Sequence, residues 1–342
     1  MRILQLSPWF RTLSQLWGQE FAAAGHEVLT VTKTAHMEHL SASGSEVIMD
    51  ARPRTPAGWR EWLRAQATVR AFDPDVVLAE QVRDVRFALL ARTTPTVLMV
   101  HDGEPHDTFH REPWQRRMSA RLRTGSVRRI VTFSRFVARQ LSPADVPIRV
   151  VPLPSEMPDA TRPTLVPAGQ RRDFITFGRV LPYKNLDVVM AAWRTFKADH
   201  PGNDDRLIVR GAGIPVTLDG PDLMRYDEEY QFAGLVTELA HCKASIAFYR
   251  KGSQSGAQVL SMQVGCPALV SAVGGLPEYQ IADLPCPDAD DPAGLTTLLG
   301  LTADPVVSEA LGRSSRSWYD EHYSVRRSGE QLVSVLEEVA RR

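Results

Sequence analysis

The chain has 342 residues, of which 43% are hydrophobic and 23% charged, a composition that excludes disordered and fibrous proteins. No apolar run approaches the about 20 residues that span a bilayer, so no transmembrane segment is expected. We expect no secretory signal, because the sequence opens on a strand-like segment, and three cysteines without metal-ligand spacing argue against a disulfide framework. We therefore expect a cytoplasmic protein, either free or peripheral at the inner membrane face.

The net charge of zero hides an asymmetry between the two halves. Residues 1–155 contain 21 Lys and Arg against 15 Asp and Glu, whereas residues 156–342 contain 19 against 25. A basic first half favours an anionic partner, such as nucleic acid, lipid head groups or a phosphorylated acceptor. The alternative is that opposite charges help the two halves pack, and the sequence leaves both open.

Short strand-like runs alternate with helix-like segments along the first half. The expected strands are 1–8, 26–33, 75–80, 96–102, 128–134 and 148–154. A helix is expected at 13–24, where Gly25 ends it. Apolar strands joined by helical crossovers predict a parallel, doubly wound sheet.

The alternation stops at residues 152–172, which contain five prolines and no clear periodicity. We place an interdomain linker at 156–172. Five further strands are expected at 173–180, 205–213, 230–236, 244–251 and 267–275. A helix behind Asn185, a good N-cap residue, separates the first two. The predicted fold is α/β, with Rossmann-like domains at 1–155 and 173–325, and ligands are expected in the cleft between them.

The stretch "FGRVLPYKN" provides the first candidate site. A strand ends at Gly178, and Arg179 and Lys184 follow in the turn before a helix. A guanidinium fork and a compact ammonium at the end of a strand suit a diphosphate. Gly211, after the next strand, would let the backbone approach the same ligand closely. Ordinary solvated turns are the alternative.

The stretch "GSQSGAQVLS" provides the second candidate site. Gly256 ends an irregular turn and begins a short helix, whose first amides form an anion site without a charged side chain. Ser253 and Ser255 would add hydroxyl donors, and Ser261 would face the same ligand one turn later. A glycine turn before a core helix is the alternative. The full set of candidate donor-site residues is Gly178, Arg179, Lys184, Gly211, Ser253, Gln254, Ser255, Gly256, Ala257 and Ser261.

In the first half, "VHDGEPHD" follows a buried strand and carries five polar side chains. They are His101, Asp102, Glu104, His106 and Asp107. Such a cluster suits general acid–base chemistry or contacts to substrate hydroxyls. The two histidines lack a third matched ligand, so no metal site is expected.

Residues 110–129 hold seven arginines against one glutamate. Trp114, Met118 and Leu122 recur every four residues, so the segment predicts a basic helix with a narrow apolar stripe. Arg111–Arg129 could therefore meet an anionic membrane or a nucleic-acid backbone. A crossover helix with a solvated face is the alternative.

Taken in order, these motifs resemble the family-4 (group 1) retaining glycosyltransferases of GT-B fold. "GRVLPYKN" is similar to the motif whose arginine and lysine contact the donor pyrophosphate, and "SMQVGCPALVSAVGGLPE" to the helix and strand of the donor site. The "YQFAGLV" run resembles the strand before the base-binding region. The resemblance implies an N-terminal acceptor domain, a C-terminal nucleotide-sugar domain and a last helix, 326–342, that returns to the first domain.

The sequence departs from the family at three places. Two donor-site glutamates, eight positions apart, fall on Ser253 and Ser261, which weakens each contact by roughly 1–2 kcal/mol. The glycine pair after the first strand is replaced near Trp9 and Phe10. A histidine common at a mid-domain strand end is replaced near Glu80 and Gln81.

The resemblance implies metal-independent transfer of a sugar, with retention, from a nucleotide-diphosphate donor to an acceptor hydroxyl, with no other cofactor. The expected catalytic residues are His101, Asp102, Arg179 and Lys184. The expected acceptor-binding residues are Trp9, Glu80, Gln81, His101, His106, Arg117 and Arg121. Two alternatives remain open: a catalytically inactive nucleotide-sugar-binding subunit, and a transferase that acts on modified bases in DNA.

Overall fold

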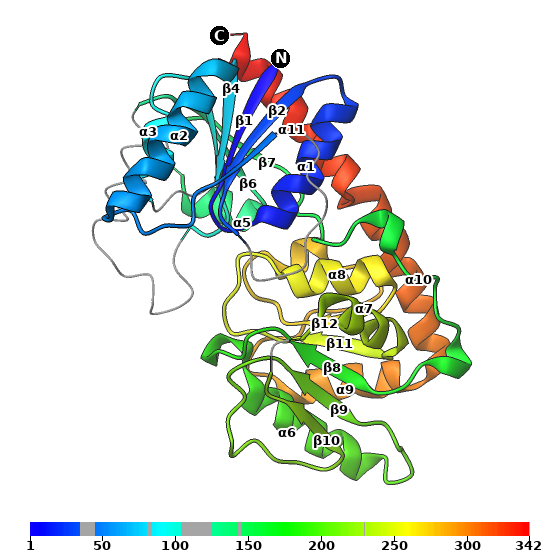
Figure 1. Cartoon of the computed structure of the whole chain (residues 1–342). Helices are drawn as coiled ribbons and strands as arrows, with labels where there is room; N and C mark the ends of the chain where they lie inside the picture. The colour runs from blue at the N-terminus through cyan, green and yellow to red at the C-terminus, as the bar shows by residue number, and fades with distance from the viewer. Residues whose placement is uncertain (35–44, 81–83, 104–124, 143–144, 229, 342) are drawn as a thin grey trace. The chain divides into compact units, whose positions relative to one another are not determined.

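The computed structural model describes residues 1–34, 45–80, 84–103, 125–142, 145–228 and 230–341. The chain forms two compact units, the first from residues 1–152 and 325–342 and the second from residues 153–324 (Figure 1). Among these residues, no helix is both long and apolar enough to cross a membrane.

The first unit is built on a seven-stranded parallel sheet in the order β3-β2-β1-β4-β5-β6-β7. The strands are β1 (Arg2–Ser7), β2 (Glu27–Thr32), β3 (Ser45–Ile48), β4 (Val76–Glu80), β5 (Thr96–Val100), β6 (Val127–Thr132) and β7 (Ile148–Val150). Six of them confirm the predicted strands. The sequence analysis missed β3, a partly exposed edge strand without the apolar run of a buried one.

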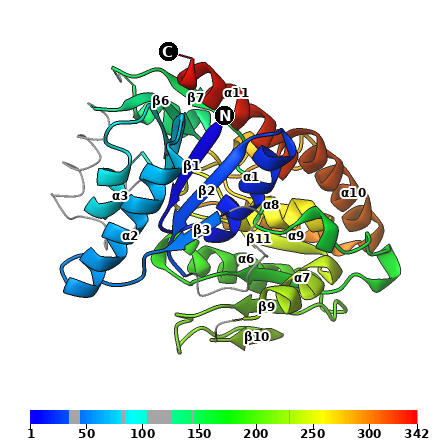
Figure 2. The ribbon, with the colours of Figure 1, turned by 45° about the horizontal axis from the view of Figure 1, so that its top comes forward.

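Helices cover both faces of this sheet. On one face, α1 (Arg11–Ala23) packs beside the last helix, α11 (Val325–Ala340), and Trp17 Nε1 donates to Ser328 Oγ at 3.0 Å. On the other lie α2 (Pro56–Phe72) and α3 (Val85–Leu90) (Figure 2). Helix α5 (Arg135–Gln140) packs into the same core through Val137. The chain therefore returns to the first unit at its C-terminus.

The second unit has a five-stranded parallel sheet in the order β10-β9-β8-β11-β12. The strands are β8 (Phe174–Phe177), β9 (Leu207–Arg210), β10 (Leu223–Tyr226), β11 (Ala244–Ala247) and β12 (Ala268–Val270). The strand predicted at 230–236 is wrong, because Phe232–His241 forms helix α7 and β10 takes the strand position. The buried side chains Leu235, Val236 and Leu239 have the spacing of a helix, which a short apolar run conceals.

Helices α6 (Leu186–Asp199) and α9 (Pro292–Ala303) cover one face of the second sheet, and α7 and α8 (Gly256–Val264) cover the other. Helix α10 (Pro305–His322) packs against α8 and α9. Asn185 stands at the N-cap position of α6 as predicted, but its side chain does not cap the helix. It adopts the left-handed conformation (φ 59°) and its Nδ2 donates to the carbonyl of Ala289 at 2.7 Å.

The proline-rich segment expected to be a linker packs as part of the second unit. It contains the short 3-10 turns Asp159–Thr161 and Ala168–Gln170, and Met157 and Val166 join the core beneath α7 and α8. The guanidinium of the buried Arg171 donates to the carbonyls of Val166 and Gly265 at 3.0 and 2.9 Å. Proline-rich composition indicates irregular backbone, but it does not distinguish a free linker from a packed one.

Candidate functional site

In the second unit, the strand order reverses between β8 and β11. From β8 the sheet extends to β9 and β10 on one side, and to β11 and β12 on the other. In open α/β sheets, ligands bind outside the carboxyl ends of the strands at such a reversal. The first predicted motif follows β8, Gly211 follows β9, and the second motif lies between β11 and β12. Hydrogen bonds through Tyr249 join the two motifs at this edge.

Gly178 and Gly211 let two backbone segments approach closely at this edge. Both residues have positive φ, 90° and 136°. A Cβ added at Gly211 would lie 2.4 Å from the carbonyl oxygen of Gly178. The sequence analysis predicted a close approach of Gly211 to a ligand, which stays a prediction; the structure shows a close approach to the backbone of Gly178.

Lys184, in the 3-10 turn Pro182–Lys184, points into the protein and is only 7% exposed. Its Nζ donates to the carbonyl of Phe177 at 2.9 Å and to the hydroxyl of Tyr249 at 2.8 Å. Burial lowers the pKa of Lys184, but the neighbouring Tyr249 and Tyr183 outweigh it and raise that pKa above its ordinary value. The ammonium is therefore charged at neutral pH and has one N–H left for a ligand.

Arg179, between Gly178 and that turn, is exposed. In the part of the chain that the structure describes, its guanidinium makes no hydrogen bond or ion pair. The two predicted cations therefore differ: Lys184 is held in place, whereas Arg179 is free to contact an anion.

The N-terminus of α8 completes this edge. Ser255 caps the helix by accepting from the amide of Gln258 at 3.2 Å, and its hydroxyl lies 3.5 Å from that of Tyr249. Within the described structure, the amides of Gly256 and Ala257 at the start of the helix have no acceptor. Two free N–H groups at a helix N-terminus form an anion site, and the hydrogen bonds through Ser255 and Tyr249 link it to Lys184.

The two serines that replace the family's glutamates differ in position. Ser253 is 6% exposed, and within the described chain its hydroxyl forms no hydrogen bond. Ser261 is fully buried, and its hydroxyl donates to the carbonyl of Ala257 at 2.7 Å. Beside Ser253, Oε1 of Gln254 is shielded from solvent, and no described residue forms a hydrogen bond with it. Ser253 and Gln254 thus have polar atoms that could bond to a ligand, whereas the hydroxyl hydrogen of Ser261 is already donated to its own helix.

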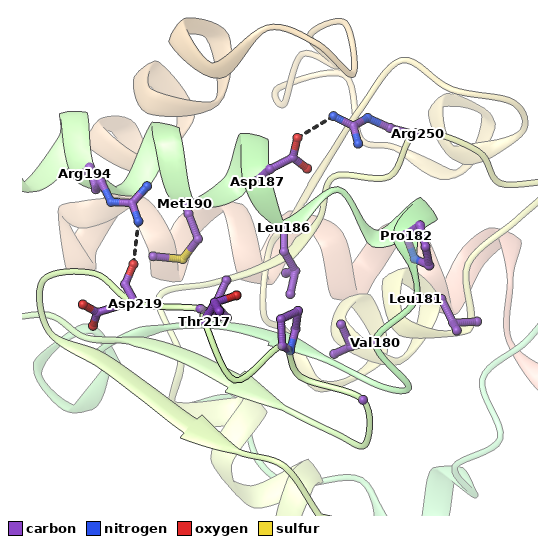
Figure 3. Close-up of a pocket in the computed structure, with 13 residues that line it drawn as sticks. Val180, Leu181, Pro182, Leu186, Asp187, Met190, Arg194, Thr217, Asp219 and Arg250 are labelled. Carbon is purple, nitrogen blue, oxygen red and sulfur yellow. Dashed lines mark hydrogen bonds and ion pairs between the residues drawn. The ribbon is translucent and has the colours of Figure 1, made fainter.

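A pocket of about 640 Å³ lies beside this edge, and the sequence analysis missed it. The start of α6 and the loop after β9 line it, with Leu186 and Met190 on the helix (Figure 3). Its rim arginines are already engaged, because Arg194 donates to the carbonyl of Asp219 and Arg250 pairs with Asp187, both at 2.6 Å. Residues 211–222 join the parallel strands β9 and β10 without the usual crossover helix, and part of this irregular loop lines the pocket. Because the loop has no periodic pattern, the sequence gives no sign of the pocket.

A second polar cluster lies in the first unit, where the strand order reverses between β1 and β4. Ser7 ends β1 and its hydroxyl donates to Oε2 of Glu80, which ends β4, at 2.6 Å. Oε1 of Glu80 lies 3.8 Å from Nε2 of His101, which follows β5. Both atoms are buried, and no residue that the structure describes forms a hydrogen bond with either of them. The rings of Phe10 and Phe133 lie 4.3 and 4.6 Å from the imidazole, centroid to centroid. The sequence analysis proposed Glu80 and His101 separately, and it missed Ser7.

The remaining predicted residues are placed as follows. Asp102 is partly buried next to His101, and Trp9 is 58% exposed. Gln81, His106, Arg117 and Arg121 lie outside the described residues. Arg129 does not belong to an exposed basic patch, because it is 6% exposed and pairs with Glu338 of α11. Across the described chain, no three His, Cys, Asp or Glu side chains gather as a metal site requires.

The chain resembles known glycosyltransferases in sequence and in fold. The family model described as Glycosyltransferase Family 4 matches residues 15–154, nearly all in the first unit. This match confirms the predicted resemblance to that family over residues 15–154, and it does not extend to the donor-site motifs at residues 178–278. A comparison with curated proteins found no match.

Several solved structures match almost the whole chain. Sucrose-phosphate synthase from Thermosynechococcus elongatus has a TM-score of 0.74 at 12% identity, over 99% of both chains. HepE from Anabaena, in complex with UDP and glucose, has a TM-score of 0.71 at 12% identity, over 98% of this chain and 99% of that one. The α,α-trehalose 6-phosphate synthase from Burkholderia multivorans has a TM-score of 0.69 at 11% identity, over 99% of this chain and 97% of that one. The protein has the GT-B fold, as predicted.

Proposed function

We propose that the protein is a glycosyltransferase that moves a sugar from a nucleotide-diphosphate donor to an acceptor hydroxyl. The observation that carries this proposal is the anion site at the reversal of the second sheet. There the free amides of Gly256 and Ala257 are linked through Ser255 and Tyr249 to the charged Lys184. The structural relative HepE, solved with UDP and glucose, supports a nucleotide-sugar donor.

Cleavage of the bond between the sugar and the diphosphate develops negative charge on the departing phosphate oxygens. Backbone amides, the Lys184 ammonium and the exposed Arg179 would stabilise that charge, and such preorganised donors are usually the largest contribution to catalysis. We propose that this stabilisation needs no metal ion and that the sugar keeps its anomeric configuration. The departing diphosphate itself would help to deprotonate the acceptor.

The first unit would supply the acceptor contacts. Oε1 of Glu80 and Nε2 of His101 are two unpaired polar atoms 3.8 Å apart, and one hydroxyl of a substrate could bond to both. Aromatic rings border the imidazole, as is common where a sugar ring stacks on a protein. We place the acceptor hydroxyl at this pair, with Asp102 beside it.

The first test measures thermal unfolding with UDP, GDP, ADP and dTDP. A nucleotide at about 100 times its dissociation constant adds ~2.7 kcal/mol to the free energy of unfolding. Stabilisation by one nucleotide, lost in Arg179→Ala, is the expected result. Arg172→Ala is the matched control, because Arg172 is also exposed but precedes β8 at the opposite end of the same strand. Equal loss in both variants, or no stabilisation by any nucleotide, contradicts the proposed donor site.

The second test measures transfer with the nucleotide sugar whose base the first identifies. Release of nucleoside diphosphate shows donor cleavage, NMR of the product shows whether the anomeric configuration is kept, and a chelator tests the need for a metal. A product of inverted anomeric configuration would refute retention but would leave the proposed donor site unaffected.

One observation favours a second candidate, a nucleotide-sugar-binding subunit without catalytic activity. The hydroxyl of Ser261 is committed to the carbonyl of Ala257, so a contact usual in the family is missing. Nucleotide-dependent stabilisation without donor cleavage, with any acceptor or with water, would identify this second function.

A further inference from the structure

Helix α2 carries a second apolar strip on the side that faces solvent. Trp59 is 43% exposed and Leu63 is 55% exposed. They are one helical turn apart, and the exposed Ala67 follows one turn later. Large apolar side chains in a row on the outer face of a helix call for an explanation, since single exposed ones are common but contiguous ones mark contact surfaces.

The packing of α2 on its own unit uses little of this strip: the ring of Trp59 meets that of Trp62 edge to face, with 5.4 Å between their centroids, and still remains 43% exposed. The opposite side of the helix faces the core through Ala65 and Val69. Trp62 Nε1 donates to the carbonyl of Arg86 at 3.2 Å, and the buried Arg86 donates to the carbonyl of Gly58 at 3.0 Å. The inner face therefore anchors the helix, and the outer strip is available for a partner.

Arginines flank the strip on the solvent side. Five exposed arginines lie on α2 or just before it: Arg52, Arg54, Arg60, Arg64 and Arg70. None of their side chains has a hydrogen-bond or ion-pair partner in the described parts of the chain. The one acid of the helix, Glu61, accepts from the amide of Ala51 at 2.9 Å and lies 3.8 Å from Arg86, so it is bound inward.

We propose that α2 is a docking surface for an anionic lipid membrane. A helix that lies in the membrane interface places Trp and Leu at the boundary of the acyl chains, while flanking arginines contact lipid phosphates. Trp59 and Leu63 supply the apolar part, and the five unpaired arginines supply a charge complementary to anionic head groups. A nucleic acid would use the arginines but would gain nothing from an exposed leucine. This inference is independent of the donor site, because α2 belongs to the first unit and the donor site to the second.

The test is flotation of the full-length protein with vesicles of phosphatidylcholine mixed with phosphatidylglycerol, and with phosphatidylcholine alone. We expect binding to the anionic vesicles that weakens as salt is added. The pair Arg60→Gln and Arg64→Gln should lower the partition coefficient about 30-fold, at roughly 1 kcal/mol per arginine. The pair Trp59→Ser and Leu63→Ser should lower it at least about tenfold.

Matched controls come from elsewhere on the surface. Leu301 and Val306, in the second unit, are 42% and 66% exposed, so Leu301→Ser with Val306→Ser removes a comparable amount of exposed apolar surface. Arg149→Gln with Arg172→Gln removes two exposed arginines. Neither pair should change vesicle binding, and circular dichroism should show all variants folded.

Three results would overturn the proposal. One is the absence of binding to anionic vesicles at low salt. Another is vesicle binding that either α2 pair leaves unchanged or that the control pairs reduce equally. The third is tight binding to duplex DNA that depends on Arg60 and Arg64 but not on Trp59 and Leu63, which would assign the surface to nucleic acid instead.

Discussion

Glu80 ends β4 and His101 follows the neighbouring parallel strand β5, and Oε1 of the carboxylate lies 3.8 Å from Nε2 of the imidazole. Both side chains are buried, 1% and 8% exposed, yet neither of these atoms has a hydrogen-bond partner among the described residues. A buried polar atom without a partner costs about 1–3 kcal/mol, so a ligand hydroxyl that bonds to both atoms would stabilise the arrangement. In the proposed function, that ligand is the acceptor hydroxyl.

Replacing Glu80 by Gln should impair turnover more than stability. The amide keeps the shape of the side chain but removes its charge, so we expect kcat to fall by about 10–100-fold, the equivalent of one charge-assisted hydrogen bond. Steady-state kinetics with the identified donor and acceptor measure this. Nucleotide-dependent stabilisation should remain, because Glu80 belongs to the first unit. A kcat within twofold of wild type would remove Glu80 from the acceptor contacts.

Replacing Tyr249 by Phe should destabilise the second unit. The phenol accepts a hydrogen bond from Lys184 at 2.8 Å, and without it a buried ammonium loses one of its two protein partners. We expect the free energy of unfolding to fall by about 1–3 kcal/mol, measured by denaturant titration. The control is Tyr226→Phe, since no described residue bonds to the hydroxyl of Tyr226. Equal effects in the two variants would show that Lys184 does not depend on this contact.

Replacing Gly211 by Ala should strain the edge where the donor site lies. The residue has φ 136°, and its new Cβ would lie 2.4 Å from the carbonyl of Gly178. We expect a loss of about 2 kcal/mol or more in the free energy of unfolding, together with weaker nucleotide binding. The control is Gly169→Ala, where a Cβ meets nothing within 4 Å. Wild-type stability of the Gly211 variant would mean that the two segments separate easily.

The buried thiol of Cys266 should make stability fall at alkaline pH. Burial raises its pKa from 9.0 to about 12. Because the folded state holds this proton more tightly than the unfolded chain, the associated stability is complete below pH 9 and is lost as pH rises toward 12.

The measurement compares denaturant unfolding of wild type and Cys266→Ala from pH 8 to 11. The alanine variant should start less stable, because it leaves a small cavity, but should lose less stability across this range. Parallel pH profiles for the two proteins would contradict a raised pKa at Cys266.

The sequence anticipated most of the fold because apolar strands and helical crossovers carry a strong local signal. The sequence-based prediction failed where that signal is weak or ambiguous. It missed β3, a partly exposed edge strand, and it took residues 230–236 for a strand, because a short apolar run fits the periodicity of a strand as well as that of a helix. The packed state of residues 153–172 also escaped it. That packing depends on contacts such as Arg171 with Gly265, which are far apart in the chain.

The candidate sites show the same division. Gly178, Arg179, Lys184 and the start of α8 were identified from motif order, because a phosphate-binding turn needs small residues, cations and a helix N-terminus close together in sequence. The sequence could not show that Lys184 is buried against Tyr249, that Ser261 bonds to its own helix, or that Ser7, Glu80 and His101 meet.

By itself, then, the sequence determined the class of fold, most of its strands and the residue types at the carboxyl ends, since these depend on local periodicity and on short motifs. Tertiary structure alone decided which of those side chains meet, which are buried and which have polar atoms left over for a ligand. The physical reason is that parallel strands distant in the chain place their carboxyl ends at one edge, so a site there is a property of the assembled sheet.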